Sequence, residues 1–219
     1  MYKFFVNQKI DNYFVLDEDI QRHIKVIRLK NEPILINYQN EYYKCNFVFP
    51  NKAEIIEKLN INHEYKQNVI VAIPIIKLSN FEIALQKAVE LGAKEIIPFT
   101  SEYTDKSNLN IVRKYDRFNK IILEAAQQSF RNAIPKLNQP KTYEEIINNY
   151  QNIIIAYENE KQVHLQEINQ DCLLMVGPEG GFSEAEISKA KQKNIEIVML
   201  SPAILRAETA LIYMLSRLK

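Results

Sequence analysis

Glycine is scarce in this chain: only four of its 219 residues are glycine, and three of them, Gly177, Gly180 and Gly181, fall within five consecutive positions. Tryptophan is absent, and only two residues are cysteine. Cys45 and Cys172 share no spacing typical of a disulfide framework or a zinc site, so we expect two buried thiols and no bound metal. The clustered glycines indicate one loop that needs a bare backbone.

Long hydrophobic segments are also missing. The longest apolar run, Val69–Ile76, is far shorter than the roughly 20 residues that a membrane-spanning helix needs. The N-terminus lacks the apolar core of a signal peptide. A net charge of +1 excludes a global attraction to nucleic acid, so a nucleic-acid partner must be held by local patches. We therefore expect a cytoplasmic protein that does not associate with membranes.

The pattern of apolar residues divides the chain into two parts. Up to about residue 66, short strand-like runs surround one helix, which Asp17 or Asp19 could cap. From Asn68 onward strands alternate with longer helices, and the last helix is expected over residues 206–218. Such alternation predicts a mostly parallel sheet. The fold class is therefore α/β, with a small β-rich domain at 1–66 and a larger domain at 67–219.

The glycine loop follows a predicted buried strand and precedes a predicted helix. Ser183 is the expected N-cap, Glu186 completes a capping box, and Phe182 with Ile187 can form a hydrophobic staple. Open α/β sheets bind ligands at the carboxyl ends of their strands. Because Glu179 places a negative charge in the turn, the loop favours a neutral or cationic ligand over a triphosphate. The alternative is that the glycines only shape a tight turn.

A second unusual segment runs from Leu200 to Leu218. Its apolar residues recur at helical spacing, as expected for a helix that faces the core or another subunit. Glu208 in the first turn is favourable near a helix N-terminus. Arg206 opposes the helix dipole there and so needs a partner, which could be Glu208, Glu179 or a substrate.

The motifs GPEGGFSEAE, ILRAETA, QKAVELGAKEIIPF and EAAQQSFRNAIP, with HIKVIRL near the N-terminus, resemble the RsmE family of small-subunit ribosomal RNA methyltransferases. This family belongs to the SPOUT superfamily, and the resemblance covers the whole chain. It implies a PUA-like β-barrel at 1–66, followed at 67–219 by a SPOUT domain that binds S-adenosylmethionine (AdoMet) and contains a deep trefoil knot. It also implies a homodimer that methylates N3 of one uridine of 16S rRNA in the small ribosomal subunit.

By the same resemblance, AdoMet is held by three loops. Their residues in this chain are Ala156, Tyr157, Met175, Gly177, Pro178, Glu179, Gly180, Gly181, Leu200, Ile204 and Leu205. From its charge alone, we infer that Glu179 would suit the sulfonium. Uracil N3 must lose a proton, so the site needs a proton acceptor and stabilisation of the uracil oxygens. Glu208 and Arg206 are the candidates for these two roles, and a purely structural pairing of the two is the alternative.

The expected RNA contacts are Lys3, Arg28 and Arg131, although Arg131 could equally be a cation at a helix C-terminus. Some positions depart from the family pattern: Ser201 stands where a glycine is usual, and Ala203, Tyr103 and Lys3 stand where arginines are usual. These departures call the turn geometry and the RNA contacts into question. Two other functions therefore stay open, an RNA-binding or assembly protein without turnover and a SPOUT methylase that acts on tRNA.

Overall fold

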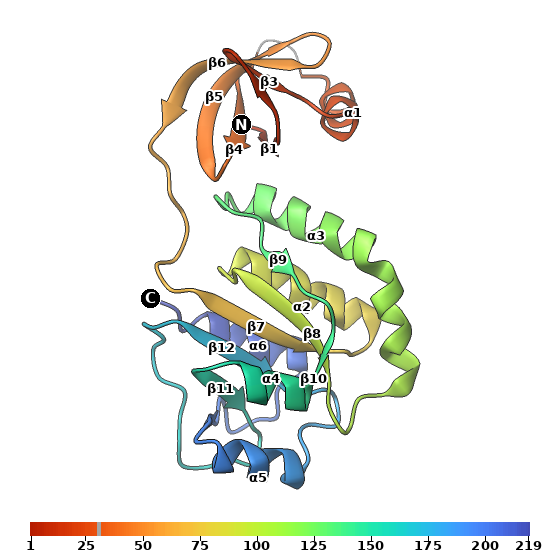
Figure 1. Ribbon diagram of the computed structural model, residues 1–219, viewed down its shortest axis with the longest axis vertical. Coiled ribbons are helices and arrows are strands. Elements are labelled where there is room, and N and C mark those ends of the chain that lie inside the picture. The colour runs from red at the N-terminus through yellow and green to blue at the C-terminus, as the bar shows by residue number, and fades with distance from the viewer. Residues whose placement is uncertain (30–31) are drawn as a thin grey trace. The chain divides into compact units, whose positions relative to one another are not determined.

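The computed structural model describes residues 1–29 and 32–219 (Figure 1). The chain divides into two compact units, one formed by Met1–Glu64 with Ala126–Ala133 and the other by Tyr65–Ala125 with Ile134–Lys219. The predicted boundary near residue 66 puts residues 126–133 in the second part, whereas the structure groups them with the first. The difference arises from contacts between residues that are far apart in sequence.

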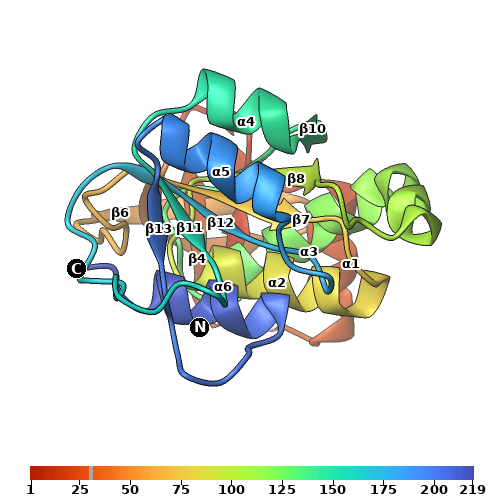
Figure 2. The same cartoon turned by 90° about the horizontal axis from the view of Figure 1, so that it is seen from below.

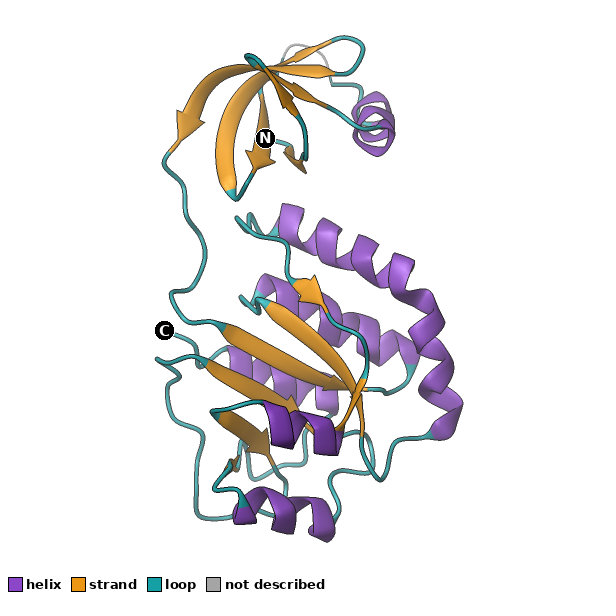
Figure 3. Ribbon diagram, viewed as in Figure 1, coloured by secondary structure: helices purple, strands orange, loops and turns teal. Residues whose placement is uncertain are grey.

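Strands make up most of the first unit (Figure 3). They form a mixed sheet with strand order β1-β4-β5-β6-β3-β2. β1 pairs with β4 in parallel, and the other neighbouring strands are antiparallel. Helix α1 (Glu18–Val26) is capped by Asp17, which accepts a hydrogen bond from the Ile20 N–H at 2.8 Å. The strands are β1 (Lys3–Phe5), β2 (Lys9–Ile10), β3 (Tyr13–Val15), β4 (Ile34–Tyr38), β5 (Glu41–Val48) and β6 (Lys52–Leu59).

Buried polar contacts attach residues 126–133 to the first unit. The Tyr42 hydroxyl donates to the Arg131 carbonyl oxygen at 2.7 Å. The Arg131 guanidinium donates two hydrogen bonds to the Glu64 carboxylate, at 2.8 and 2.6 Å. The backbone N–H groups of Asn132 and Ala133 donate to the same carboxylate at 2.8 and 3.1 Å. Because Glu64 accepts from several groups at once, this turn is held by a charge-assisted network.

The second unit is built on a sheet whose strand pairs are all parallel, as the alternation of strands and helices predicts. The strand order is β10-β8-β7-β12-β11-β13, and β9 pairs with β8. The central strands are continuous apolar runs because both faces of the sheet are covered. The strands are β7 (Val69–Pro74), β8 (Glu95–Thr100), β9 (Lys136–Leu137), β10 (Lys141–Thr142), β11 (Ile153–Ala156), β12 (Cys172–Val176) and β13 (Glu196–Val198).

Helices form the outer layers of the second unit: α4 and α5 cover one face of the sheet, and α2 and α6 cover the other (Figure 2). The predicted α/β fold is therefore confirmed. The last helix differs from expectation, because α6 ends at Leu215 rather than at residue 218. A 3-10 helix precedes α3. The helices are α2 (Leu78–Glu90), the 3-10 helix (Lys106–Lys114), α3 (Tyr115–Gln128), α4 (Tyr143–Asn149), α5 (Glu184–Gln192) and α6 (Ala207–Leu215).

Candidate functional site

A cavity of about 640 Å³ lies in the second unit at the carboxyl ends of its parallel strands. Its size is typical of pockets that bind small molecules, which run from about 300 to 1,000 Å³. The loops that follow β11, β12 and β13 supply most of its walls, and the first turns of α2 and α6 supply the rest. Nearly all residues expected to contact the cofactor line it: Ala156, Tyr157, Gly177, Pro178, Glu179, Gly180, Gly181, Leu200, Ile204 and Leu205. Arg206 and Glu208 line it as well.

Met175 is the exception among the expected cofactor residues. Its side chain is fully buried and belongs to the same core cluster as Phe182 and Ile187. The cavity meets β12 at Val176 instead. Successive side chains of a strand point to opposite faces of the sheet, so Met175 and Val176 have different surroundings. Met175 therefore supports the loop from the core and does not line the cavity.

The helix start after the glycine loop is built as the sequence predicts. The Ser183 hydroxyl accepts from the Glu186 N–H at 3.2 Å, and the Glu186 carboxylate accepts from the Ser183 N–H at 2.9 Å. Phe182 and Ile187, on either side of this capping box, are both buried in the core. Glu186 also accepts from the Glu102 N–H at 3.0 Å, which ties the turn after β8 to the start of α5. The loop is thus fixed at its helical end.

Each glycine of the loop is required by a close approach or by its backbone angle. Gly181 has a φ of 71°, in the left-handed region, and a Cβ atom there would collide with the Glu158 carboxylate. A Cβ on Gly180 would lie 2.9 Å from the Tyr103 Cβ atom. A Cβ on Gly177 would lie 3.1 Å from the backbone of Gly181. The bare backbone lets the loop fold closely on itself and on its neighbours.

Gly181→Ala is expected to weaken binding of the small-molecule ligand by about 30-fold. The left-handed backbone conformation costs an alanine roughly 1–2 kcal/mol, and the new methyl group displaces the Glu158 side chain. Calorimetric titration with AdoMet measures the change. Gly181→Ala should cost less affinity when it is introduced into Glu158→Ala than into wild type, because the collision is then absent and only the backbone cost remains. Equal affinity of wild type and Gly181→Ala would contradict this account of the loop.

Charged groups give the cavity an acidic lining. Three carboxylates, those of Glu158, Glu179 and Glu208, face two cations, Lys77 and Arg206. One Glu179 oxygen accepts from the Lys77 backbone N–H at 3.2 Å. Glu208 is only 9% exposed, although it lines the cavity. A negative balance of this kind suits a cationic or neutral ligand, as Glu179 alone led us to expect.

Arg206 and Glu208 do not form an ion pair with each other or with any other residue that the structure describes. Arg206 is the N-cap of α6, but its side chain makes no capping hydrogen bond. The structural pairing of these two residues, the alternative to catalysis, is therefore not observed. A nearly buried carboxylate and an exposed guanidinium both remain open to a ligand in the cavity.

One departure from the family pattern, Ser201, has a structural explanation. The Ser201 hydroxyl accepts from the Ala203 N–H at 3.1 Å, and the Ser201 backbone is not left-handed. A serine therefore replaces the usual glycine without backbone strain and holds the turn by a side-chain hydrogen bond. Tyr103 packs against Gly180, and 51% of its surface is exposed.

The residues expected to contact RNA all belong to the first unit. The Lys3 ammonium donates to the Gln128 carbonyl oxygen at 3.4 Å and lies 4.7 Å from the centre of the Phe130 ring. Arg28 is exposed. Arg131 differs from expectation, because its side chain is 3% exposed and its guanidinium faces Glu64. The structure gives Arg131 an internal role that sequence could not reveal.

Sequence reasoning missed Lys77, Asn80 and Glu158, which line the cavity. Lys77 and Asn80 follow the carboxyl end of β7, and Glu158 follows that of β11. Their position in the sequence could have identified them, because polar residues that follow buried parallel strands gather at the carboxyl edge of the sheet.

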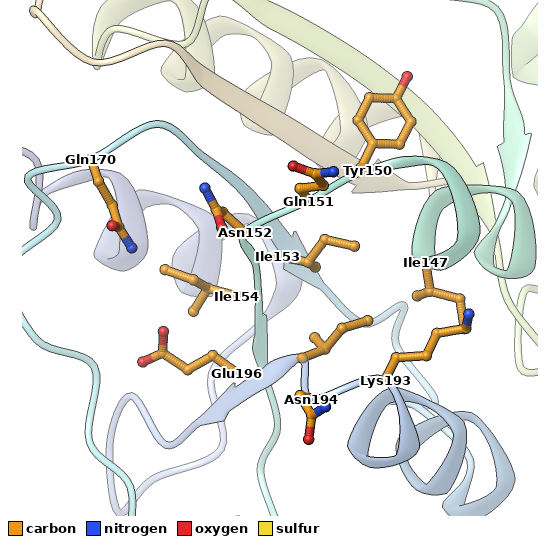
Figure 4. Close-up of a pocket in the computed structure, with 11 residues that line it drawn as sticks. Ile147, Tyr150, Gln151, Asn152, Ile153, Ile154, Gln170, Lys193, Asn194 and Glu196 are labelled. Carbon is orange, nitrogen blue, oxygen red and sulfur yellow. The ribbon is translucent and has the colours of Figure 1, made fainter.

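A second cavity, of about 570 Å³, lies at the opposite edge of the same sheet (Figure 4). Gln151 and Asn152, at the start of β11, line it together with Lys193 and Asn194, which follow α5. It lies at the amino ends of β11 and β13, away from the edge where ligands usually bind open α/β sheets. The cavity at the carboxyl edge is therefore the candidate functional site.

Neither thiol is available for ligand chemistry. Cys45 and Cys172 are free and buried, as predicted, and burial raises their pKa values to about 12 and about 11. Within residues 1–29 and 32–219, no group of three or more His, Cys, Asp or Glu side chains could hold a metal ion. None of the helices described in this chain combines the length and apolar character that crossing a membrane requires.

Comparison with known proteins points to RNA methylation. The family model of an RNA methyltransferase domain matches residues 63–219. Ribosomal RNA small subunit methyltransferase E of Mesomycoplasma hyopneumoniae is 42% identical over 223 residues, which cover 99% of this chain and 98% of that protein. The enzyme of the same name from Bacillus subtilis is 27% identical, with 95% of this chain and 90% of that protein covered.

Solved structures agree with the sequence comparison. A ribosomal RNA small subunit methyltransferase E from Neisseria gonorrhoeae, crystallised with S-adenosyl methionine, has a TM-score of 0.89 and 26% identity over 99% of this chain and 95% of that one. A putative methyltransferase from Legionella pneumophila, in complex with the bound cofactor SAM, has a TM-score of 0.81 and 25% identity, with 98% of this chain and 95% of that one covered.

Proposed function

The chain belongs to the family of ribosomal RNA small subunit methyltransferases E, and from this we propose that it transfers a methyl group from AdoMet to ribosomal RNA. The observation that carries the proposal is the cavity at the carboxyl edge of the parallel sheet, where the predicted donor-binding residues and both predicted catalytic residues converge. The solved relative from Neisseria gonorrhoeae that binds S-adenosyl methionine supports the choice of donor.

The residues of the cavity fit this donor. A volume of about 640 Å³ accommodates a nucleoside with an amino-acid side arm. The apolar Leu200, Ile204 and Leu205 offer a surface for an adenine ring, and their backbone groups can hydrogen-bond to its edge. The acidic lining suits the cationic part of the donor. Gly177 and Gly181 line the cavity and let the loop fold closely on itself and on Glu158, which shapes the wall of the donor site.

The catalytic roles follow from chemistry and position. When bound, AdoMet supplies an electrophilic methyl carbon on a sulfonium. Glu208 would accept the proton that a uracil nitrogen must lose before it attacks that carbon. Arg206, whose guanidinium has no ion-pair partner among the described residues, would stabilise the negative charge that develops on a uracil oxygen or bind a phosphate. The rigid cavity would align the reactants, an effect worth up to about 7–11 kcal/mol.

We propose N3 of one uridine of 16S rRNA, in the assembled small subunit, as the acceptor. Residues 1–66 would form a PUA-like RNA-binding domain, with Lys3 and Arg28 as contacts, and residues 67–219 a SPOUT domain with a trefoil knot. The enzyme would act as a cytoplasmic homodimer. Two large apolar side chains on neighbouring helices support a subunit interface: Ile83 on α2 is 43% exposed and Tyr213 on α6 is 39% exposed.

The expected result in a methyl-transfer assay with labelled AdoMet is stoichiometric labelling of intact small subunits that were prepared without the endogenous modification. Primer extension should then stop at one uridine, because a methyl group on N3 blocks base pairing. Naked 16S rRNA should be a poor substrate, since the proposed acceptor is presented by the assembled particle.

The other outcomes separate the competing functions. Labelling of isolated tRNA in preference to small subunits would favour a tRNA methylase. Binding of subunits without any labelled product, at saturating AdoMet, would favour an assembly protein without turnover. Either result would replace the proposed function.

A further inference from the structure

Glu158 is a carboxylate of the donor cavity to which neither the sequence motifs nor the proposed reaction assigns a role. It follows the carboxyl end of β11 and lines the cavity. Its side chain lies so close to Gly181 that a Cβ atom there would collide with a carboxylate oxygen. No residue that the structure describes forms an ion pair or a hydrogen bond with this carboxylate. Its charge is therefore directed at whatever occupies the cavity.

Glu208 provides an independent sign that the cavity is prepared for positive charge. It is 91% buried and lines the cavity without an ion-pair partner in the described part of the chain. Burying an unpaired carboxylate is costly unless a bound group compensates it. With Glu158 and Glu179, three carboxylates face the two cations Lys77 and Arg206, so the lining has an excess of one negative charge.

The proposed reaction changes the charge of the bound donor. The uracil nitrogen gives up its proton and forms a bond to the methyl carbon, while the carbon–sulfur bond breaks and its electron pair stays on sulfur. The sulfonium thereby becomes a neutral thioether. AdoMet has a net charge of +1, from its sulfonium and ammonium groups and its carboxylate, whereas the product S-adenosylhomocysteine has a net charge of zero. A lining with excess negative charge distinguishes the two molecules although they have nearly the same shape.

We propose that Glu158 is a specificity-determining residue that favours the sulfonium donor over the thioether product and so promotes product release. This inference rests on the proposed function, since it presumes that AdoMet is the ligand. Glu158 acts by charge at the rim of the glycine loop and does not touch the transferred proton. Because Glu158 is exposed, water and salt screen part of its attraction for a cationic ligand. The attraction is still stronger at the wall of a cavity than between two charges in open solvent.

The test is calorimetric titration of the full chain with AdoMet, S-adenosylhomocysteine and an analogue that carries an ammonium group in place of the methylsulfonium. Glu158→Gln keeps the size and polarity of the side chain and removes only the charge. We expect it to weaken binding of the two cationic ligands by about fivefold and to leave binding of the thioether nearly unchanged. Glu158→Asp keeps the charge and should retain most of the selectivity.

A matched control is Glu184→Gln, which removes an exposed carboxylate close in sequence to the same loop but outside the cavity lining. It should leave the preference for AdoMet over S-adenosylhomocysteine unchanged. Raising the salt concentration should reduce the selectivity of wild type more than that of Glu158→Gln.

The outcomes separate this inference from the proposed function. A wild-type chain that binds neither AdoMet nor its product would overturn both. A wild type that binds both, and a Glu158→Gln variant with the same ratio of affinities, would overturn the role of Glu158 and leave the proposed function intact.

Discussion

Glu208→Gln is expected to lower the rate of methyl transfer to small subunits by at least about 100-fold, the usual contribution of a general base. Glutamine keeps the shape of a side chain that is 91% buried, but it cannot accept the proton of the uracil nitrogen. Affinity for AdoMet should fall only by the few-fold that one lost negative charge explains. Single-turnover rates with labelled donor measure the first effect, and calorimetry measures the second.

The pH profile separates catalysis from a structural role. If Glu208 is the proton acceptor, the rate of Glu208→Gln should rise with pH, because deprotonated uridine then forms without enzymatic help. A merely structural defect would lower the rate equally at every pH. Glu184→Gln is the control, since it places the same substitution in the first turn of α5. A Glu208→Gln enzyme with wild-type rate would remove Glu208 from the mechanism.

Arg131→Ala is expected to destabilise the first unit by about 3–5 kcal/mol, the usual effect of removing one partner of a buried ion pair. The alanine leaves Glu64 without its guanidinium partner, although the carboxylate is still largely buried. Urea denaturation of the full chain, followed by circular dichroism, measures the change. Arg117→Ala is a matched control, because Arg117 pairs with Glu82 on the surface and is 62% exposed. It should cost less than about 1 kcal/mol.

This effect should depend on pH. Burial raises the pKa of Glu64. The hydrogen bonds and charge of Arg131, and hydrogen bonds from the backbone N–H groups of Ala133 and Asn132, lower this pKa by more. The pKa of Glu64 therefore lies below its ordinary value of 4.5. A carboxyl group whose pKa is lower in the folded state stabilises the fold above its unfolded pKa, and this contribution is lost as the pH falls through the folded pKa. The difference between wild type and Arg131→Ala should therefore shrink below about pH 4.5. A difference that grows in acid would contradict the assignment.

Local features were predictable from the sequence because short-range chemistry decides them. The capping box of Ser183 and Glu186 needs only residues three positions apart, and the structure has it. The parallel sheet followed from apolar strands that alternate with helices. The donor loops were placed by motifs, and most of the expected residues meet at one edge of the sheet.

Long-range contacts limited the rest of the prediction. The attachment of Arg131 to Glu64 joins residues 67 positions apart, which no local pattern reveals. Met175 was assigned to the cavity from the family resemblance, but the alternation of side chains along β12 turns it into the core. Glu158 directly follows Tyr157 in a predicted donor loop, but only the folded chain brings its side chain against Gly181.

The most direct measurement is a crystal structure of this chain with AdoMet. The account predicts density for the donor between the loop of Gly177–Gly181 and the segment of Leu200–Arg206, with the sulfonium on the side of Glu158 and Glu208. Density for the donor in the cavity at the amino ends of β11 and β13, or bound away from the glycine loop, would contradict it.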